Sequence, residues 1–215
     1  FILPAPQAVL NRAVRAWQFG NLGGHVQVTL VETLVGFGAS ALLATLLGYL
    51  TASFRLIKNL VKPYLIALQT IPVLAITPLL IIWFGTGLLT KYLIAGLISF
   101  LPMYLTSLTA FAQIEPVYHQ DLRVLGASRL QSLFKMEIPA SLPQLFGGYK
   151  TGITLALMGA VVGEFAGAQR GLGFLISFGK GMLDTPLVFV ALFCLLFMGS
   201  GLFGLVSAME KLLVK

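Results

Sequence analysis

Charged residues are scarce in this sequence. Asp, Glu, Lys and Arg make up 10% of the 215 residues, whereas an ordinary soluble domain carries about 25%. Hydrophobic residues make up 58% of the chain, and the mean hydropathy is +0.94. This balance excludes an ordinary soluble domain and indicates an integral membrane protein.

Acidic residues are scarcer than basic ones, and the formal net charge is +7. Such an excess can indicate nucleic-acid binding. The 14 basic residues, however, are scattered between apolar runs and are not gathered with aromatic residues on one face. We therefore expect no nucleic-acid partner, and we interpret the basic residues as determinants of membrane topology.

Cysteine and histidine are nearly absent. The single cysteine, Cys194, excludes an intramolecular disulfide, so a metal site would need other ligands, and His25 and His119 each stand alone as histidines. A phosphate-binding loop is excluded too, because five residues rather than four separate Gly173 from Gly179. We expect the chain to be no enzyme, to hold no metal and to bind no cofactor itself.

Long uncharged runs fill most of the chain. A hydrocarbon core of roughly 30 Å takes about 20 residues of helix, and five runs are long enough to cross it. The sequence therefore predicts an all-α integral membrane protein in which residues 1–215 form one polytopic helical bundle. The predicted spans lie at about 33–54, 64–84, 92–114, 149–167 and 186–209.

Two prolines, Pro72 and Pro78, interrupt the second run. Proline removes a backbone hydrogen bond, which membrane helices tolerate where neighbours or a water-lined path satisfy the freed carbonyl. Together with Gln69 and Trp83 these prolines are candidates for lining a translocation pathway. A kinked helix packed inside the bundle is the alternative.

Small residues recur at every fourth position in the fourth run. Such rows let helices approach closely in lipid, so we expect a tight helix interface here. One row is Gly148, Gly152, Ala156 and Ala160, and the other is Gly159, Gly163 and Gly167.

Glu164 is an acid inside the same apolar run, and a charge in such a place is a functional hypothesis by default. At 1.5 Å per residue it lies about 21 Å along the helix from Lys150, in the outer third of the bilayer. It is either an acid at the outer water interface or paired with a basic neighbour, or it lines the pathway at an external gate.

Two short segments suit the membrane interface. Arg12, Arg15 and Trp17 lie in an amphipathic run that is typical of an interfacial helix. Gly171 to Asp184 is rich in glycine and contains only a short apolar element around Leu175, which we expect to enter the interface without crossing.

The longest polar interval runs from Glu115 to Lys150. Apolar periodicity in 117–125 and 130–136 predicts two surface helices, and Gly126 between them is interpreted as a hinge. Nine Lys and Arg residues fall on the side of this interval and five on the other side. The positive-inside rule therefore places the interval in the cytoplasm.

This interval resembles the EAA loop of ABC-importer permeases. In that pattern, Glu-Ala-Ala is followed by three residues, a glycine, nine residues and I-x-L-P. Gly126 and Pro139 have the matching separation, with Gln120-Asp121-Leu122 at the position of Glu-Ala-Ala. The resemblance implies a cytoplasmic coupling loop at 115–148 that contacts an ATPase. The residues it assigns to this contact are Asp121, Gly126, Ala127, Ser128, Arg129, Ser132 and Pro139.

Further matches extend along nearly the whole chain, in the order expected. The chain resembles the permeases of importers for nitrate, sulfonate, taurine and bicarbonate, with pyrimidine-precursor importers as close relatives. The matching segments are Leu3-Pro4-Ala5-Pro6, Gln69-Thr70-Ile71-Pro72 to Ile82-Trp83-Phe84-Gly85, Leu125-Gly126-Ala127-Ser128, Val162-Gly163-Glu164, Arg170-Gly171-Leu172-Gly173 and Leu183-Asp184-Thr185-Pro186.

The resemblance implies a type I ABC-importer permease fold, with a sixth span before Phe1. It also implies a homodimer in the bacterial inner membrane, surrounded by lipid, with two ATPase subunits or domains that hold ATP and magnesium and with an extracytoplasmic binding protein. The solute expected is small and anionic, or a pyrimidine vitamin precursor. The alternative is a secondary carrier or channel, but such carriers usually show inverted repeats and midplane carboxylates, and we find neither here.

Overall fold

The computed structural model describes residues 3–70, 72–114 and 128–214, and every regular element in these ranges is a helix. The prediction of an all-α fold is confirmed. Predicted helix 117–125 lies outside the described residues. In chain order the elements are α1 (Pro6–Gln18), α2 (Leu22–Ser53), α3 (Arg55–Thr70), α4 (Val73–Phe84), α5 (Leu88–Ala112), α7 (Arg129–Ser132), the π-helix η1 (Leu133–Glu137), α8 (Ile138–Phe165), α9 (Leu172–Gly181) and α10 (Thr185–Leu213).

Four helices among the described residues are long and apolar enough to cross a membrane: α2, α5, α10, and α8 together with η1. The segment 64–84, predicted as one span, is instead divided between α3 and the shorter apolar helix α4. Pro72 has an extended backbone and precedes the first residue of α4. Because proline has no amide hydrogen to continue a helix, it separates the two elements.

Two of the long helices begin earlier than predicted. α2 starts at Leu22 rather than near residue 33, and α8 starts at Ile138 rather than near residue 149. Charged residues therefore lie inside these helices, where oppositely charged side chains of neighbouring helices stabilise them. Lys150 in α8, for example, forms an ion pair with Glu210 in α10.

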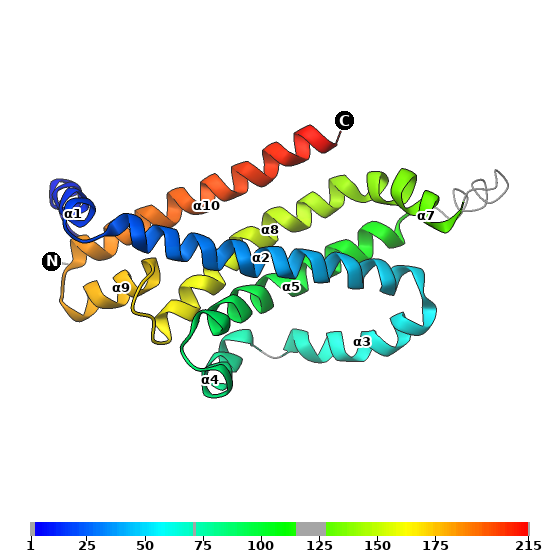
Figure 1. Cartoon of the computed structure of the whole chain (residues 1–215), viewed down its shortest axis with the longest axis horizontal. Coiled ribbons are helices and arrows are strands. Elements are labelled where there is room, and N and C mark those ends of the chain that lie inside the picture. The colour runs from blue at the N-terminus through cyan, green and yellow to red at the C-terminus, as the bar shows by residue number, and fades with distance from the viewer. Residues whose placement is uncertain (1–2, 71, 115–127, 215) are drawn as a thin grey trace.

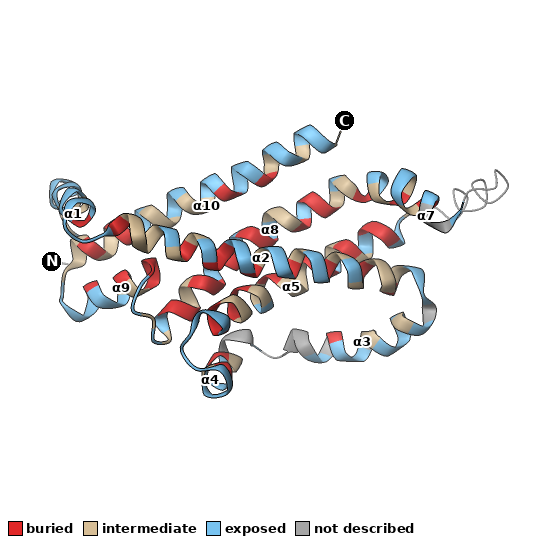
Figure 2. Ribbon diagram, viewed as in Figure 1, coloured by how far each residue is buried: buried red, intermediate tan, exposed pale blue. Residues whose placement is uncertain are grey.

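Helices α2, α5 and α8 form the core, where the buried residues concentrate (Figure 2). A Cβ added at Gly159 of α8 would lie 2.6 Å from the Cα of Ala95 in α5, and one added at Gly36 of α2 would lie 2.6 Å from the Cβ of Ala95. Ser40 Oγ also donates to the Gly96 carbonyl at 2.6 Å. The backbones thus approach closely, and the predicted tight interface of the small-residue rows is confirmed.

Helices α1 and α9 and the start of α10 lie at one end of the molecule, here called the α9 end; α7 and the turn between α2 and α3 lie at the other, the α7 end (Figure 1). At the α9 end, Asp184 accepts a hydrogen bond from the amide of Leu187 at 3.1 Å and caps α10. Its other oxygen binds Arg12 Nε of α1 at 2.6 Å. The short element predicted within 171–184 is confirmed as α9, a helix of 10 residues.

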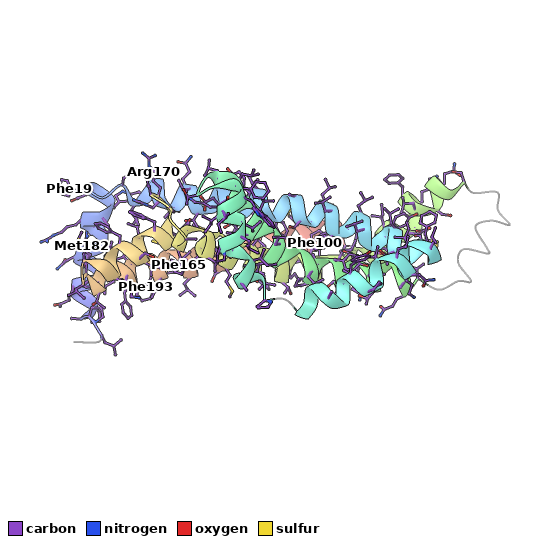
Figure 3. All side chains as sticks on the ribbon, turned by 90° about the horizontal axis from the view of Figure 1, so that it is seen from below. Phe19, Phe100, Phe165, Arg170, Met182 and Phe193 are labelled. Atoms are coloured by element: carbon purple, nitrogen blue, oxygen red, sulfur yellow. The ribbon has the colours of Figure 1, made fainter. Side chains whose placement is uncertain are left out.

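The outer faces of α4 and α10 carry large exposed apolar side chains. Ile82 and Trp83 of α4 are 76% and 66% exposed, and Phe197 of α10 is 72% exposed. Side-chain sticks project along much of the bundle surface (Figure 3). In a membrane protein such faces lie against lipid or another chain.

Candidate functional site

Four buried polar side chains gather where the core meets α9. Thr29 and Glu32 come from α2, Lys91 from α5 and Glu164 from α8, and each of the four residues is at most 6% exposed. The close packing of α2, α5 and α8 brings these residues together from distant parts of the sequence.

An ion pair joins α2 to α5 in this cluster. Lys91 Nζ donates to Glu32 Oε1 at 2.8 Å. The second oxygen, Glu32 Oε2, is buried and has no hydrogen-bond partner among the described residues. Glu164 also interacts electrostatically with both Glu32 and Lys91. The cluster therefore contains two carboxyl groups and one ammonium group.

The carboxylate of Glu164 links α8 to both α2 and α9. Its Oε1 accepts a hydrogen bond from Thr29 Oγ1 at 2.5 Å, and its Oε2 accepts one from the backbone amide of Gly173. The side chain is therefore fixed from two sides inside the bundle.

Three successive backbone amides at the start of α9 donate to side chains of other helices. Gly171 donates to His25 Nδ1 at 3.0 Å, Leu172 donates to Thr29 Oγ1 at 2.8 Å, and Gly173 donates to Glu164. The first amides of a helix have no partner within it, and they form the positive end of the helix dipole. His25, Thr29 and Glu164, here called the α9-capping cluster, satisfy these amides and place a carboxylate at the positive end.

Two glycines leave the space that this arrangement needs. A Cβ added at Gly171 would overlap the carboxylate of Glu164, and Gly171 has a φ of +121° that other residues rarely adopt. A Cβ added at Gly173 would lie 2.9 Å from Glu164 Oε2. The motif Arg170-Gly171-Leu172-Gly173 thus lets α9 approach the carboxylate.

The cluster holds helices together rather than presenting reactive groups. In the ranges that the structure describes, no group of His, Cys, Asp and Glu could hold a metal ion. The ring of His25 stacks on Phe174 of α9, with centroids 5.7 Å apart. The contacts attach α9 to α2 and α8.

The predicted pathway residues fall into two groups in this chain. Glu164 is buried in the core, not at a water interface, and it is not an isolated acid. Pro78 and Trp83 lie instead on the exposed α4, and Pro72 directly precedes its first residue. Gln69 belongs to α3, and its side chain is outside the described residues. Within the single chain, Glu164 therefore forms a site separate from the exposed face of α4.

The predicted coupling residues are described only in part. Asp121, Gly126 and Ala127 lie outside the described residues, as does the side chain of Arg129. Ser128 and Gln131 exchange hydrogen bonds at the start of α7: the Ser128 amide donates to Gln131 Oε1 at 2.9 Å, and the Gln131 amide donates to Ser128 Oγ at 3.3 Å. This is the capping-box arrangement, which starts a helix.

The other two coupling residues lie further along the same helical segment. Ser132 is 9% exposed at the end of α7, and Pro139 is exposed in the first turn of α8. α7, η1 and α8 follow one another without a break from Arg129 to Phe165. The run 130–136, predicted as a separate surface helix, is thus the first part of a long helix.

Sequence reasoning missed His25, Thr29, Glu32 and Lys91. Lys91 was counted as a topology signal, and Glu32 lies directly before an uncharged run. Two signals were available. Glu32 and Thr29 are three residues apart, on one face of any helix that begins earlier than residue 33, and a buried acid in a membrane span usually requires a basic partner such as Lys91.

Comparison with known proteins places the chain in a family. The profile of the family described as "Binding-protein-dependent transport system inner membrane component" matches residues 44–215. A riboflavin transport system permease protein of Chloroflexus aurantiacus is 43% identical over 215 residues, which cover 100% of this chain and 80% of that protein. A putative aliphatic sulfonates transport permease protein of Bacillus subtilis is 28% identical over 100% of this chain and 78% of its own length.

The fold agrees with this assignment. The inward-facing methionine ABC transporter MetNI contains a chain that superposes with a TM-score of 0.71 at 18% identity, covering 89% of this chain and 95% of that one. At this identity the likeness shows the fold. Taken with the four long apolar helices, these findings show that the chain belongs to the binding-protein-dependent transport system inner membrane components, as a multi-pass inner-membrane permease of an ABC importer.

Proposed function

We propose that this chain forms the solute pathway of an importer driven by a separate ATPase. We also propose that movement of the predicted coupling loop is transmitted to the α9 end through one continuous helical segment, here called the rod. The observation that carries the proposal is the unbroken series α7, η1 and α8 from Arg129 to Phe165. At 1.5 Å per residue this rod is about 55 Å long. Its first part lies within the predicted coupling loop, 115–148, and its last turn carries Glu164.

The rod connects the two ends of the molecule through hydrogen bonds as well as through the backbone. Glu164 binds the amide of Gly173, so a shift of the α8 end pulls on the start of α9 or breaks that bond. Thr29 belongs to α2, and therefore the same shift also changes the contact between α8 and α2. Opening and closing at the α9 end follow from movement at the α7 end.

The expected partners are a second copy of the chain, two ATPase subunits or domains, and an extracytoplasmic binding protein. ATP and magnesium are held by the ATPase. The α7 end faces the cytoplasm in this proposal, and the α9 end faces the binding protein. These assignments are supported by the matching family, which is described as binding-protein-dependent, and by the similarity to permeases of ABC importers. The exposed apolar face of α10 provides a surface for the second copy and for lipid.

We further propose that α4 lines the pathway and that the solute is a planar heteroaromatic molecule. The sequence of α4, Val73–Phe84, contains no charged residue and presents exposed Trp83, which suits stacking on an aromatic ring. The 43% identity to a riboflavin transport permease supports this class of solute.

A small anionic solute is the second candidate. The sulfonate permease of Bacillus subtilis and a taurine transport system permease protein of Escherichia coli, both 28% identical to this chain, favour it. Uptake by vesicles that contain the permease, its ATPase and its binding protein separates the candidates. Riboflavin uptake that taurine does not compete for supports the first, and ATP-dependent taurine uptake alone supports the second.

The mechanical proposal is tested with pairs of spin labels in the assembled transporter. Labels at Ser128, within the predicted coupling loop, and at Ser177, an exposed residue of α9, should both change their distance to the equivalent site in the second copy when ATP is trapped. Labels at Ser200, an exposed position of α10, provide the control. If the Ser128 distance changes while the Ser177 distance stays constant, the rod does not transmit the movement.

A further inference from the structure

Helix α1 presents an exposed apolar stripe at the α9 end. Leu10, Val14 and Trp17 follow one another at intervals of four and three residues, which places them on one face, and they are 67%, 55% and 68% exposed. A different face, with Val9, Ala13 and Ala16, packs on the cluster formed with α9 and α10. The stripe is therefore additional to the surface that folds against the bundle.

A basic hollow lies beside this stripe. Its volume is about 220 Å³, and its lining residues are Ala8, Asn11, Arg12, Arg15 and Pro186. Arg12 is bound to Asp184, whereas Arg15 is exposed and forms no ion pair with the described part of the chain. No acidic residue occurs in α1. The hollow therefore has an unneutralised cation and suits an anionic group.

A phospholipid has the chemistry that matches both features. Its phosphate suits the guanidinium of Arg15 and the amide of Asn11, while its acyl chains suit the neighbouring apolar stripe. Two further exposed apolar residues, Phe19 and Met182, lie at the same end of the molecule (Figure 3). Helices α2 and α10, which are long and apolar enough to cross a membrane, begin at this end as well, so the stripe lies where a membrane surface is expected.

We propose that α1 lies in the membrane interface and that the hollow between α1 and α10 binds the phosphate of an anionic phospholipid. The ion pair between Arg12 and Asp184 joins α1 to the residue that caps α10. Lipid bound at this place contacts Arg12 and Pro186, beside the residue that caps α10. This binding site is separate from the solute pathway and does not depend on the solute transported.

The two tryptophans of the chain make the proposal testable by fluorescence. Trp83→Phe leaves Trp17 as the single tryptophan. In nanodiscs, Trp17 emission should be quenched by phospholipids brominated near the headgroup end of an acyl chain and protected from aqueous iodide. Quenching by iodide without quenching by brominated lipid overturns the proposal. So does protection that arises only when the binding protein is added, because it identifies a protein docking surface.

The headgroup site is tested with brominated phosphatidylglycerol and phosphatidylcholine at equal total lipid. Trp17 should be quenched preferentially by phosphatidylglycerol, and Arg15→Gln should reduce that preference about fivefold, the effect of one basic residue at an anionic surface. Arg170→Gln removes an exposed basic residue at the same end and should leave the preference unchanged (Figure 3). Equal losses in both variants, or none in Arg15→Gln, overturn the headgroup site.

A second variant covers the case in which Trp83→Phe does not fold. Trp17→Phe retains Trp83, and the difference between its quenching and that of the unchanged protein reports Trp17 alone. Loss of the lipid-dependent component in Trp17→Phe supports the proposal, and an unchanged lipid-dependent component refutes it.

Discussion

Thr29→Val is the sharpest perturbation of the α9-capping cluster. Valine has nearly the shape of threonine but lacks the hydroxyl that donates to Glu164 at 2.5 Å and accepts from the Leu172 amide at 2.8 Å. Thr29 is 0% exposed, so water cannot replace either bond without reorganisation of the bundle.

The expected effect follows from the two lost bonds. A buried amide left without a partner costs about 1–3 kcal/mol, and a hydrogen bond to a charged group contributes about 1.5–3 kcal/mol. Because one hydroxyl makes both bonds, we expect the attachment of α9 to weaken by about 3 kcal/mol in total. Since 1.4 kcal/mol is a factor of ten, local opening of α9 should become more frequent on the order of 100-fold.

Hydrogen exchange measured by mass spectrometry on peptides covering 171–181 provides the assay, with the protein in nanodiscs. Thr33→Val is the matched control. Thr33 is also 0% exposed and lies one turn further along α2, but its hydroxyl donates to the Thr29 carbonyl at 2.8 Å and to no other group in the described part of the chain. Such bonds back to the preceding turn contribute little to helix stability, so exchange in α9 should stay nearly unchanged.

Equal exchange in the two variants would contradict the reasoning, because it would mean that the hydroxyl of Thr29 does not hold α9. Faster exchange throughout α2, α5 and α8 in Thr29→Val would also contradict it, since that pattern reports general unfolding instead of local release. If α9 is released alone, the same variant should also change the Ser177 distance in the absence of ATP.

Two further predictions concern the stability of the bundle. Lys91→Met leaves Glu32 buried without its partner at 2.8 Å and should lower the free energy of unfolding by about 3–5 kcal/mol. In a thermal unfolding assay, the double variant Lys91→Met with Glu32→Gln should recover most of that loss. A double variant as unstable as Lys91→Met would exclude the ion pair as the cause. Gly159→Ala places a Cβ 2.6 Å from the Cα of Ala95 and should lower the free energy of unfolding by about 1–3 kcal/mol. Gly147→Ala, whose added Cβ meets nothing within 4 Å, should be neutral or slightly stabilising. The same assay compares the two variants, and equal effects would show that α5 and α8 are not closely packed.

Composition and periodicity alone predicted the class of protein and much of its packing. Few charges and long uncharged runs indicate membrane helices because an unpaired charge in hydrocarbon is costly. The glycine and alanine rows of α8 predicted close packing because small side chains let backbones approach, and Gly159 does so against Ala95. The motif around Gly126 indicated the importer family, which the family match confirms.

The ends of the helices were less predictable where a charged residue was taken to mark the end of a span. Glu32 was placed outside the first predicted span, and the fourth predicted span began only at residue 149, beside Lys150, because a lone charge normally ends an apolar run. In the folded chain each has an opposite charge from another helix, Lys91 for Glu32 and Glu210 for Lys150. Local sequence cannot show a partner that is 59 or 60 positions away, so both helices extend further than predicted.

The α9-capping cluster was decided by tertiary structure alone. Its side chains come from α2 and α8, and the amides they bind belong to the start of α9. A helix start needs acceptors for its first amides, but nothing in its own sequence specifies which side chains supply them. The sequence determined that Gly171 and Gly173 leave room for a close approach; the packing of α2 against α8 determined that the approaching group is the carboxylate of Glu164.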